Sequence, residues 1–340
     1  MNKKHLIIAD PYPQTLERIF TKETLAKLKE TADIIESHET HMSAQQFDEL
    51  LPEAAAIIGQ SAMPRERIEK AKKLKVIFNV EGNFFQNIDY PECFKRNIRV
   101  LNCGAVYALP VAEMALALAI DLSRGITWEH LRFRQGNERY ILDGNQNSRL
   151  LSGSTVGLIG FGLLGKSLRS LLKPFRCKVK VFDPWLPESI IRDHECQPVN
   201  LDELLSTCST IFILAGVTNE NKGFLGKREF DLIQKGSNVL LMSRAAVVDF
   251  EEFVTQIESG RFKGATDVFP YEPFEEEHKI RKLDSIILSP HRAGGIPEAF
   301  TSIGDMILDD FGLMMRGLSP VRMQAAQPEL IARFSSKPVG

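Results

Sequence analysis

The sequence lacks the features that mark secreted, membrane-spanning and nucleic-acid-binding proteins. Its amino terminus has only a short apolar run, too short for a signal peptide, and no segment is of low complexity. The five cysteines form no C-x-x-C pair, and the histidines show no spacing typical of metal ligands. The net charge of −2 gives no electrostatic reason to bind nucleic acid or an anionic membrane. We therefore expect a cytoplasmic protein with reduced thiols, with no metal and with no nucleic-acid or membrane partner.

The length and composition indicate a globular protein of more than one domain. A chain of 340 residues is too long for one ordinary hydrophobic core, which predicts two domains. A hydrophobic content of 44% with 25% charged residues is typical of a soluble globular protein. The most apolar later stretch, residues 111–126, contains Glu113 and Asp121, so we expect a buried helix rather than a membrane span.

Short β-type runs alternate with helical runs along most of the chain. A first series occupies about the first hundred residues, with one helical run expected from Thr15 to Lys29. A loop near Asn102 and one long helix, from about Pro110 to Gln135, separate it from a second series of six β-type runs. The tail after His291 is helical again. Such alternation predicts right-handed crossovers, so we expect an α/β fold with two doubly wound parallel sheets.

Residues 156–168, VGLIGFGLLGKSL, carry three glycines in a G-x-G-x-x-G pattern. An apolar strand precedes the glycines and an amphipathic helix follows them, which is the context of a dinucleotide-binding turn. We expect Gly160 and Gly162 to let the backbone turn and approach a pyrophosphate, and Gly165 to let helix and strand pack closely. The backbone amides of Leu163 and Leu164 would then face the phosphates at the N-terminus of the helix.

The next β-type run ends in an acidic residue, Asp183, which follows Gly160 by 23 residues. A carboxylate at this place accepts hydrogen bonds from the adenosine ribose and repels a 2′-phosphate. Pro184 and Trp185 follow it, so no adjacent cation receives a 2′-phosphate, and we expect NADH to be preferred over NADPH. A glycine-rich corner with a solvent-exposed Asp183 is the alternative, but strand, turn, helix and acid in this order favour the dinucleotide.

Three polar residues fall at or just beyond the carboxyl ends of strands in the second series, where such sheets bind ligands. Arg244 suits a carboxylate, because its guanidinium donates two parallel hydrogen bonds. A pair formed by His291 and Glu272 suits proton transfer to a carbonyl oxygen, because the carboxylate orients the imidazole and stabilises its protonated form. For each residue, a solvated loop charge or a structurally satisfied histidine is the alternative.

The segments LLMSRAAVVD, GATDVFPYEP and LSPHRAGG resemble the three signature segments of the D-isomer-specific 2-hydroxyacid dehydrogenases. They occur in the family's order, after the glycine fingerprint. The resemblance extends over almost the whole chain: residues 82–104 are similar to the family's substrate loop and the strand after it, and residues 111–126 to its long interdomain helix.

This resemblance implies a hydride transfer between NAD(H) and a small 2-hydroxy or 2-oxo acid of D configuration. It implies a flavodoxin-like substrate domain made of residues 1–103 and 296–340, and a Rossmann-type NAD-binding domain at 104–295. His291 would be the acid/base, Glu272 its partner and Arg244 the group that binds the substrate carboxylate. The resemblance further implies a nicotinamide site at Met242, Ser243, Arg244, Asp267 and His291, and backbone amides at Glu81 and Gly82 that hold the carboxylate.

The chain departs from the family pattern at several positions. Phe84 stands where the substrate loop usually has a glycine, and Tyr107 where many members have an asparagine. Ala245 replaces a usual glycine, and the His-x-Pro-Leu segment ahead of Thr218 is missing. None of these changes removes a catalytic group. Two aromatic rings would nevertheless reshape a substrate pocket, so the substrate of a relative is not carried over.

Two further expectations follow from the family alone. Its members are usually homodimers through the NAD-binding domain. The C-terminal-binding-protein corepressors share its fold and signature residues, so a nicotinamide-sensing regulatory protein is the alternative to an enzyme.

Overall fold

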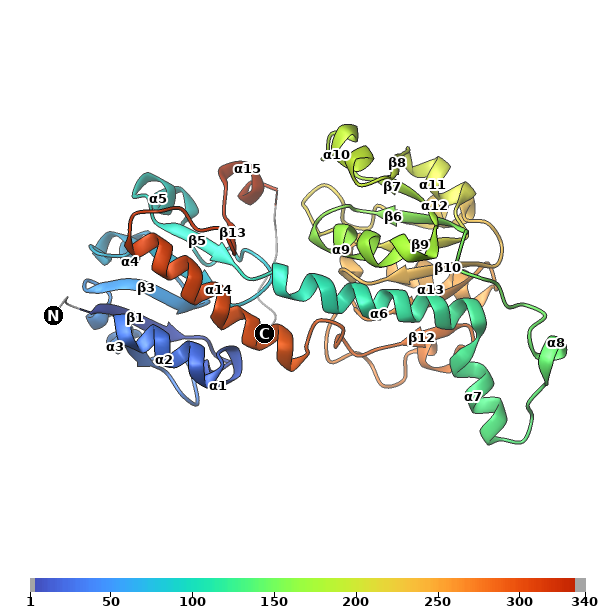
Figure 1. The fold of residues 1–340 in the computed structure, drawn as a ribbon, viewed down its shortest axis with the longest axis horizontal. Helices are drawn as coiled ribbons and strands as arrows, with labels where there is room; N and C mark the ends of the chain where they lie inside the picture. Colours follow the sequence, from blue (N-terminus) through green and yellow to red (C-terminus); the bar gives the residue numbers. More distant parts are fainter. Residues whose placement is uncertain (1–3, 334–340) are drawn as a thin grey trace. The chain divides into compact units, whose positions relative to one another are not determined.

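The computed structural model describes residues 4–333, which form two compact units. Among the described residues, the first unit contains 4–107, 218–220 and 295–333, and the second contains Ala108–Val217 and Asn221–Gly294. Each has its own sheet and its own hydrophobic core, and the chain leaves the first unit and returns to it at the end (Figure 1).

The sheet of the first unit has six strands within the described residues, in the order β13-β5-β4-β3-β1-β2. All neighbours pair in parallel except β13, which is antiparallel to β5. Without β13 the order is that of flavodoxin, so the expected flavodoxin-like sheet is confirmed. The strands are β1 (His5–Asp10), β2 (Ala32–Glu36), β3 (Ala54–Gly59), β4 (Val76–Asn79), β5 (Arg99–Asn102) and β13 (Gln324–Ala325).

Helices cover both faces of this sheet because alternate strand residues point to opposite sides. One core joins Ile7 and Ala9 of β1 to apolar residues of helices α1, α2 and α14. The other joins Ile8 of β1 to helices α3, α4 and α5. The helices of this unit are α1 (Leu16–Ile19), α2 (Lys22–Thr31), α3 (Ala44–Leu50), α4 (Arg65–Lys70), α5 (Tyr90–Lys95), α14 (Pro297–Met315) and α15 (Pro328–Ile331).

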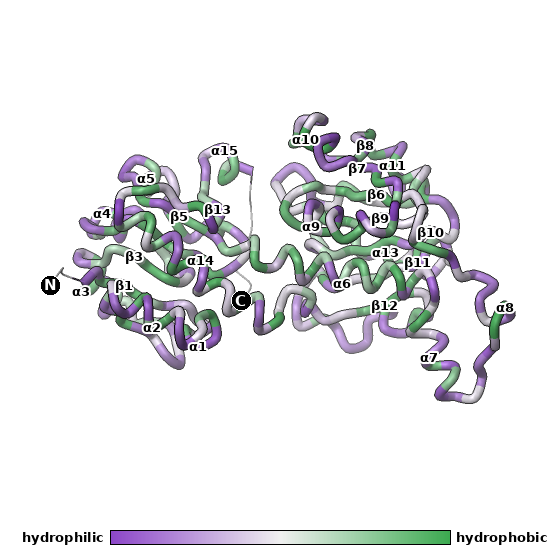
Figure 2. Tube along the Cα trace, in the orientation of Figure 1, coloured by the Kyte–Doolittle hydropathy of each residue, from purple (hydrophilic) through white to green (hydrophobic). Residues whose placement is uncertain are grey.

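The sheet of the second unit is fully parallel and has seven strands, in the order β12-β11-β10-β9-β6-β7-β8. Six of them follow the strand order of the Rossmann fold, with β12 added beyond the last, which confirms the expected doubly wound domain. Figure 2 shows hydrophobic colour along much of the central strands, and β6, β9 and β10 are almost fully buried, as expected for strands covered on both faces. The strands are β6 (Thr155–Ile159), β7 (Lys178–Phe182), β8 (Gln197–Pro198), β9 (Thr210–Ile213), β10 (Ser237–Leu241), β11 (Phe262–Thr266) and β12 (Ile286–Leu288).

Two cores hold the helices on the faces of this sheet. Helices α6, α9 and α10 contribute to one core, and α11, α12 and α13 to the other. The helices are α6 (Ala105–Arg124), α7 (Ile126–Arg134), α8 (Ile141–Gly144), α9 (Leu163–Leu172), α10 (Glu188–Asp193), α11 (Leu201–Thr207), α12 (Lys227–Leu232) and α13 (Phe250–Glu258), with 3-10 turns η1 (Lys173–Phe175), η2 (Ala245–Val247) and η3 (Lys279–Lys282).

Three expected element boundaries are wrong. The single helix expected from Pro110 to Gln135 is two helices, because Gly125 adopts φ +69° between α6 and α7. The helical run from Thr15 is also broken, since Thr21 caps a second helix with its side chain. The second sheet has one strand more than expected, because β8 has only two residues and leaves no periodicity to detect.

Helix α6 is the one helix among the described residues that is long and apolar enough to cross a membrane by length and composition. A core helix of a soluble protein passes the same test. Here Ala112, Ala115 and Ala119 are fully buried within one core of the second unit, together with Leu122. This packing is what the sequence predicted for residues 111–126.

Candidate functional site

The turn between β6 and α9 holds all three glycines, and at two of them a larger residue does not fit. Gly160 has φ +93°, and a Cβ there would lie 2.6 Å from the Ala215 backbone nitrogen. A Cβ on Gly165 would lie 2.8 Å from the Gly160 carbonyl oxygen. Gly162 differs, because a Cβ there would meet nothing within 4 Å. The backbone needs glycine at the first and third positions, whereas the middle glycine borders open space that a ligand can fill.

The open space lies at the N-terminus of a helix of ten residues. Gly162 is the N-cap of α9 without a side chain to cap it, and Leu163 and Leu164 are the first helical residues. Their amides have no partner inside the helix, so they can bind an anion. The side chain of Asp183 lies beside this turn, because its Oδ2 accepts a hydrogen bond from the Phe161 amide at 2.8 Å. The residues present fit a dinucleotide with its pyrophosphate at the turn and a ribose at Asp183.

Arg244, Glu272 and His291 follow the carboxyl ends of β10, β11 and β12. These strands are neighbours in the parallel sheet, so the three loops emerge from one edge. The glycine turn follows the carboxyl end of β6 and therefore belongs to the same edge. The topology thus brings the predicted chemical groups to the edge where such sheets bind ligands.

The structure pairs His291 with Glu272. His291 Nδ1 lies 2.7 Å from Glu272 Oε2, and the two side chains are 35% and 29% exposed. A carboxylate at this distance accepts the Nδ1 proton, which leaves Nε2 as the nitrogen that exchanges a proton with a ligand. The arrangement is that of a general acid/base held in one ring orientation.

A buried carboxylate holds the loop that carries His291. Asp267 is 2% exposed, and it accepts hydrogen bonds from the Ser289 hydroxyl at 2.5 Å and from the Arg292 and Ala293 amides at 3.0 Å. Asp267 was expected at the nicotinamide, and these contacts give it a second role in fixing the 289–293 loop. Ser289 was not singled out from the sequence, because only the fold brings its hydroxyl to Asp267.

The segment before Arg244 offers a buried polar atom to a ligand. Ser243 Oγ is buried and has no hydrogen-bond partner in the described part of the chain. Met242 is 3% exposed and belongs to the core beneath the strand end. The Arg244 guanidinium donates to the Ser243 carbonyl oxygen at 2.7 Å. An orphaned hydroxyl at this edge is consistent with a bound cofactor that supplies the missing partner.

In the first unit, a buried asparagine shapes the loop after β4, which we expected to bind the substrate carboxylate. Asn79, 1% exposed, accepts a hydrogen bond from the Glu81 amide at 2.8 Å and donates one to the Asn83 carbonyl at 2.8 Å. The Glu81 amide is therefore occupied, which corrects the expectation that it binds the carboxylate. The Gly82 and Asn83 amides have no partner among residues 4–333, so they are the donors this loop offers.

Of the two unexpected aromatic residues, Tyr107 lies beside this loop. A Cβ on Gly82 would touch the Tyr107 ring at 3.4 Å, and the ring also contacts Phe300. Burial, together with Cys103 and the Glu81 carboxylate, raises the pKa of the Tyr107 hydroxyl far above its usual value, so it stays protonated. Phe84, which follows Asn83 in the same loop, is 4% exposed and packs in the core against Tyr90, so its effect on a substrate pocket stays a prediction.

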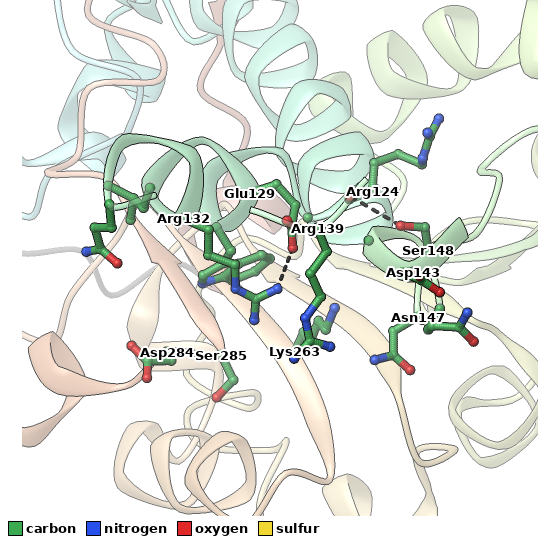
Figure 3. A pocket seen from close by; sticks show the side chains of 16 residues that line it. Arg124, Glu129, Arg132, Arg139, Asp143, Asn147, Ser148, Lys263, Asp284 and Ser285 are labelled. Atoms are coloured by element: carbon green, nitrogen blue, oxygen red, sulfur yellow. Dashed lines mark hydrogen bonds and ion pairs between the residues drawn. The ribbon is translucent and has the colours of Figure 1, made fainter. Parts of the chain in front are cut away.

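A pocket of about 520 Å³ lies away from all of these residues, at the amino ends of β11 and β12 (Figure 3). It contains none of the residues predicted for a site. Its charges are mixed, and Arg132 is paired with Glu129 as the dashed line shows. It is lined by residues of the α6–α7 junction and the 135–148 segment, with Lys263, Asp284 and Ser285.

Comparisons with known proteins agree with this geometry. Residues 116–293, just over half of the chain, match the profile of the D-isomer specific 2-hydroxyacid dehydrogenase, NAD binding domain. NAD(H) is therefore the cofactor of the second unit. A crystal structure of a phosphoglycerate oxidoreductase from Rhizobium etli is similar, with a TM-score of 0.87 and 40% identity over 95% of this chain and 99% of that one.

Curated relatives are similar at lower identity. A glyoxylate reductase from Thermofilum pendens is 28% identical over 89% of this chain and 91% of its own length. A D-3-phosphoglycerate dehydrogenase from Archaeoglobus fulgidus is 29% identical over 86% of this chain, which spans only 55% of that relative. These names are of dehydrogenases and reductases, so the regulatory alternative is not favoured. The profile match and the Rhizobium structure show that this chain belongs to the D-isomer specific 2-hydroxyacid dehydrogenase family.

Proposed function

We propose that the protein interconverts a small 2-oxo acid and its D-2-hydroxy acid, with His291 as acid/base, Glu272 as its partner and Arg244 as the carboxylate-binding group. The observation that carries this proposal is the 2.7 Å contact between His291 Nδ1 and Glu272 Oε2. It lies at the same sheet edge as the glycine turn and Arg244. When bound, the nicotinamide supplies or accepts the hydride at C2.

The residues divide the remaining work. During reduction His291 Nε2 donates a proton to the oxygen that becomes the hydroxyl, and during oxidation it removes that proton. Glu272 stabilises the protonated imidazole and fixes its orientation. Arg244 binds the carboxylate through two N–H groups and polarises the carbonyl. In the first unit, Gly82 and Asn83 offer two backbone amides to an anionic group, and in the second unit the glycine turn, Asp183 and Ser243 hold the dinucleotide.

We also propose that the first unit is the substrate domain and the second the NAD-binding domain. The expected boundaries, at residues 103/104 and 295/296, lie within a few residues of the boundaries of the compact units. A cytoplasmic location is proposed because all five cysteines are free thiols and four of them are buried.

A homodimer through the second unit is supported by its exposed apolar residues. Within residues 4–333, seven of the fifteen exposed large hydrophobic residues fall in the short stretch 126–150, which includes α7 and α8. Ile141 is 87% exposed and has φ +52°, a backbone conformation that a β-branched residue rarely adopts. The 520 Å³ pocket borders the same stretch. The seven residues, here called the arm surface, are Ile126, Leu131, Phe133, Tyr140, Ile141, Leu142 and Leu150.

The test of the proposed function is turnover with a series of 2-oxo acids, followed through the absorbance of NADH. Binding of NADH is measured separately by fluorescence. Wild-type protein is expected to bind NADH and to oxidise it only when a 2-oxo acid is present. His291→Ala is expected to bind NADH with little change and to lose turnover in both directions. Binding of NADH without turnover on any 2-oxo acid would instead support a regulatory protein.

A further inference from the structure

The carboxyl edge of the first unit's sheet contains no positively charged side chain in its loops. Five segments follow the ends of β1 to β5, at residues 11–15, 37–43, 60–64, 80–89 and 103–104. All are described by the structure, and none contains a lysine or an arginine. The charged residues that they do contain, besides the histidines, are Glu39, Glu81 and Asp89. This edge holds the Asn79 loop, where we place the substrate.

Arginines of the adjoining elements are engaged in other contacts. Arg67, in α4, donates to Asp48 Oδ1 at 2.7 Å and to the Ala62 carbonyl oxygen in the loop after β3 at 2.8 Å. Arg65, in α4, donates to Asp89 Oδ2 at 3.2 Å, and Arg18, in α1, donates to Gln14 at 3.2 Å. Arg322 precedes the antiparallel strand β13 and donates to Asp309 at 2.8 Å. Arginine and lysine side chains bind a phosphate or a second carboxylate more strongly than neutral donors such as backbone amides do. This edge offers none that is uncommitted among the described residues.

The same edge offers hydrogen-bond acceptors instead. Gln60 Oε1 and Asn87 Oδ1 are both buried and have no hydrogen-bond partner in the described part of the chain. Their loops are in contact, because Asn87 Nδ2 donates to the Gln60 carbonyl oxygen at 2.5 Å. Buried acceptors without partners are uncommon and are satisfied by groups that donate hydrogen bonds.

The nearby carboxylates add negative charge to this edge. Glu81 lies next to Gly82, one of the two free amide donors, and its charge acts on Cys103 and Tyr107. Asp10, at the end of β1, is 3% exposed and is held by the Ser37 and Ser61 hydroxyls at 2.8 Å and 2.7 Å. His41 Nδ1 also lies 3.2 Å from Asp10 Oδ2, so the acidic groups at this edge are held by partners within the unit.

We propose that the substrate carries no anionic group besides its C1 carboxylate, and that its far end donates hydrogen bonds through a hydroxyl or an amino group. This inference rests on the proposed function and narrows its substrate class. It excludes phosphorylated and dicarboxylic 2-oxo acids, although some relatives are named for phosphoglycerate. Those names do not transfer, because the first unit provides no partner for the phosphate.

The experiment compares kcat/KM of the full chain with NADH on four 2-oxo acids, three of which share the three-carbon skeleton of pyruvate. Hydroxypyruvate carries a hydroxyl at C3 that can donate a hydrogen bond, and pyruvate lacks this donor. The 3-phosphate ester of hydroxypyruvate carries a second anionic group in its place. The 2-oxo acid of arginine tests a cationic donor. The better of the two donor-bearing acids is expected to exceed pyruvate by about tenfold and the phosphate ester by about a hundredfold.

A pair of variants ties the preference to this edge. Gln60→Arg puts a cation on the loop after β3 and is expected to narrow the gap between the phosphate ester and hydroxypyruvate by about tenfold. Gln60→Met has a similar length without charge or acceptor, and it is expected to lower the rate on the preferred acid without improving the ester. If either variant fails to fold, the wild-type series alone decides.

The outcomes separate the two proposals. Equal or faster turnover of the phosphate ester would overturn this inference and leave the proposed function intact. Equal kcat/KM on pyruvate and both donor-bearing acids would overturn the part that concerns hydrogen-bond donors. Failure to oxidise NADH with any of the acids, while NADH still binds, would overturn the proposed function itself.

Discussion

His291 is held from several sides at once. Its backbone has φ +47°, which is uncommon for a residue other than glycine. The backbone amide of His291 donates a hydrogen bond to the Ser289 carbonyl oxygen at 3.0 Å. The Asp267 carboxylate accepts hydrogen bonds from Ser289 and Arg292, which lie on either side of His291 in the chain. Unusual backbone conformations persist where surrounding hydrogen bonds fix them, and they occur often at functional sites. The imidazole is therefore presented to Glu272 in a fixed position.

The first prediction concerns the contact between Glu272 and His291. Glu272→Gln keeps the shape of the side chain but removes the carboxylate that accepts the Nδ1 proton and holds the imidazole in one orientation. We expect kcat/KM for reduction of the 2-oxo acid to fall by about tenfold or more, while the Kd of NADH changes little. An unchanged kcat/KM would show that Glu272 does not act on His291.

The second prediction concerns Arg244. If its planar guanidinium binds the substrate carboxylate, Arg244→Lys replaces a two-point contact by a single charge. We expect kcat/KM for the 2-oxo acid to fall about a hundredfold, equivalent to about 2.7 kcal/mol. The Kd of NADH, measured by fluorescence, should change far less. Parallel losses in both quantities would assign the arginine to the cofactor.

The third prediction concerns cofactor choice at Asp183. Its two oxygens accept hydrogen bonds from the Phe161 and Trp185 amides, so the carboxylate is fixed at the strand end. A fixed negative charge repels a 2′-phosphate, and kcat/KM is expected to be higher with NADH than with NADPH. Asp183→Ala should lower the ratio of kcat/KM with NADH to kcat/KM with NADPH, mainly by lowering kcat/KM with NADH. A wild-type preference for NADPH would contradict the assignment.

At the scale of elements, the β6–α9 turn separates what the fold needs from what the ligand needs. Gly160 and Gly165 are required by close backbone approaches, whereas Gly162 faces open space. A similar distinction holds after β4, where Asn79 fixes the turn and leaves two amides free. In both turns, the groups available to a ligand are those the fold does not use itself.

The fourth prediction uses this distinction as a matched pair. Gly162→Ala meets no protein atom within 4 Å, so the midpoint of thermal unfolding should stay nearly unchanged. Its Cβ fills the space assigned to the pyrophosphate, and the Kd of NADH should rise by about tenfold or more. Gly160→Ala is the comparison, because φ +93° and the Ala215 backbone make it destabilising by about 1–3 kcal/mol. Unchanged NADH affinity in Gly162→Ala would place the dinucleotide elsewhere.

At the scale of the whole molecule, the chain is two separately packed units with different tasks. Each unit has its own cores, formed by different strands and helices. The long helix α14 lies in a core of the first unit with β1, although it follows the whole second unit in the chain. The arm surface belongs to the second unit and is left exposed by a single chain.

The fifth prediction concerns the oligomer. The double variant Phe133→Asp with Ile141→Asp puts two charges on the arm surface, and burying them in an apolar interface is costly. Sedimentation should show a dimer for the wild type and a monomer for the variant, with unchanged circular dichroism. Val321→Asp changes a residue that is 73% exposed in the first unit, and it should remain a dimer. A monomeric wild type, or a variant that stays dimeric, would contradict the proposed interface.

The sequence by itself determined the two parallel sheets, the dinucleotide turn and the loops that carry the candidate chemistry. These features depend on local requirements, such as apolar periodicity in buried strands and glycine where φ is positive or a backbone passes closely. Local signals failed where they are short or ambiguous. The two-residue strand β8 and the helix break at Gly125 are examples.

Only the tertiary structure decided which of these residues meet. The hydrogen bond between Glu272 and His291 forms because β11 and β12, the strands before these residues, are neighbours in the sheet. The occupied Glu81 amide depends on the side chain of Asn79, and the burial of Phe84 on the position of Tyr90. The charge of a whole sheet edge likewise emerges from five loops that are far apart in sequence. Contacts between distant residues follow from strand order and register, and a single sequence does not encode these in any local pattern.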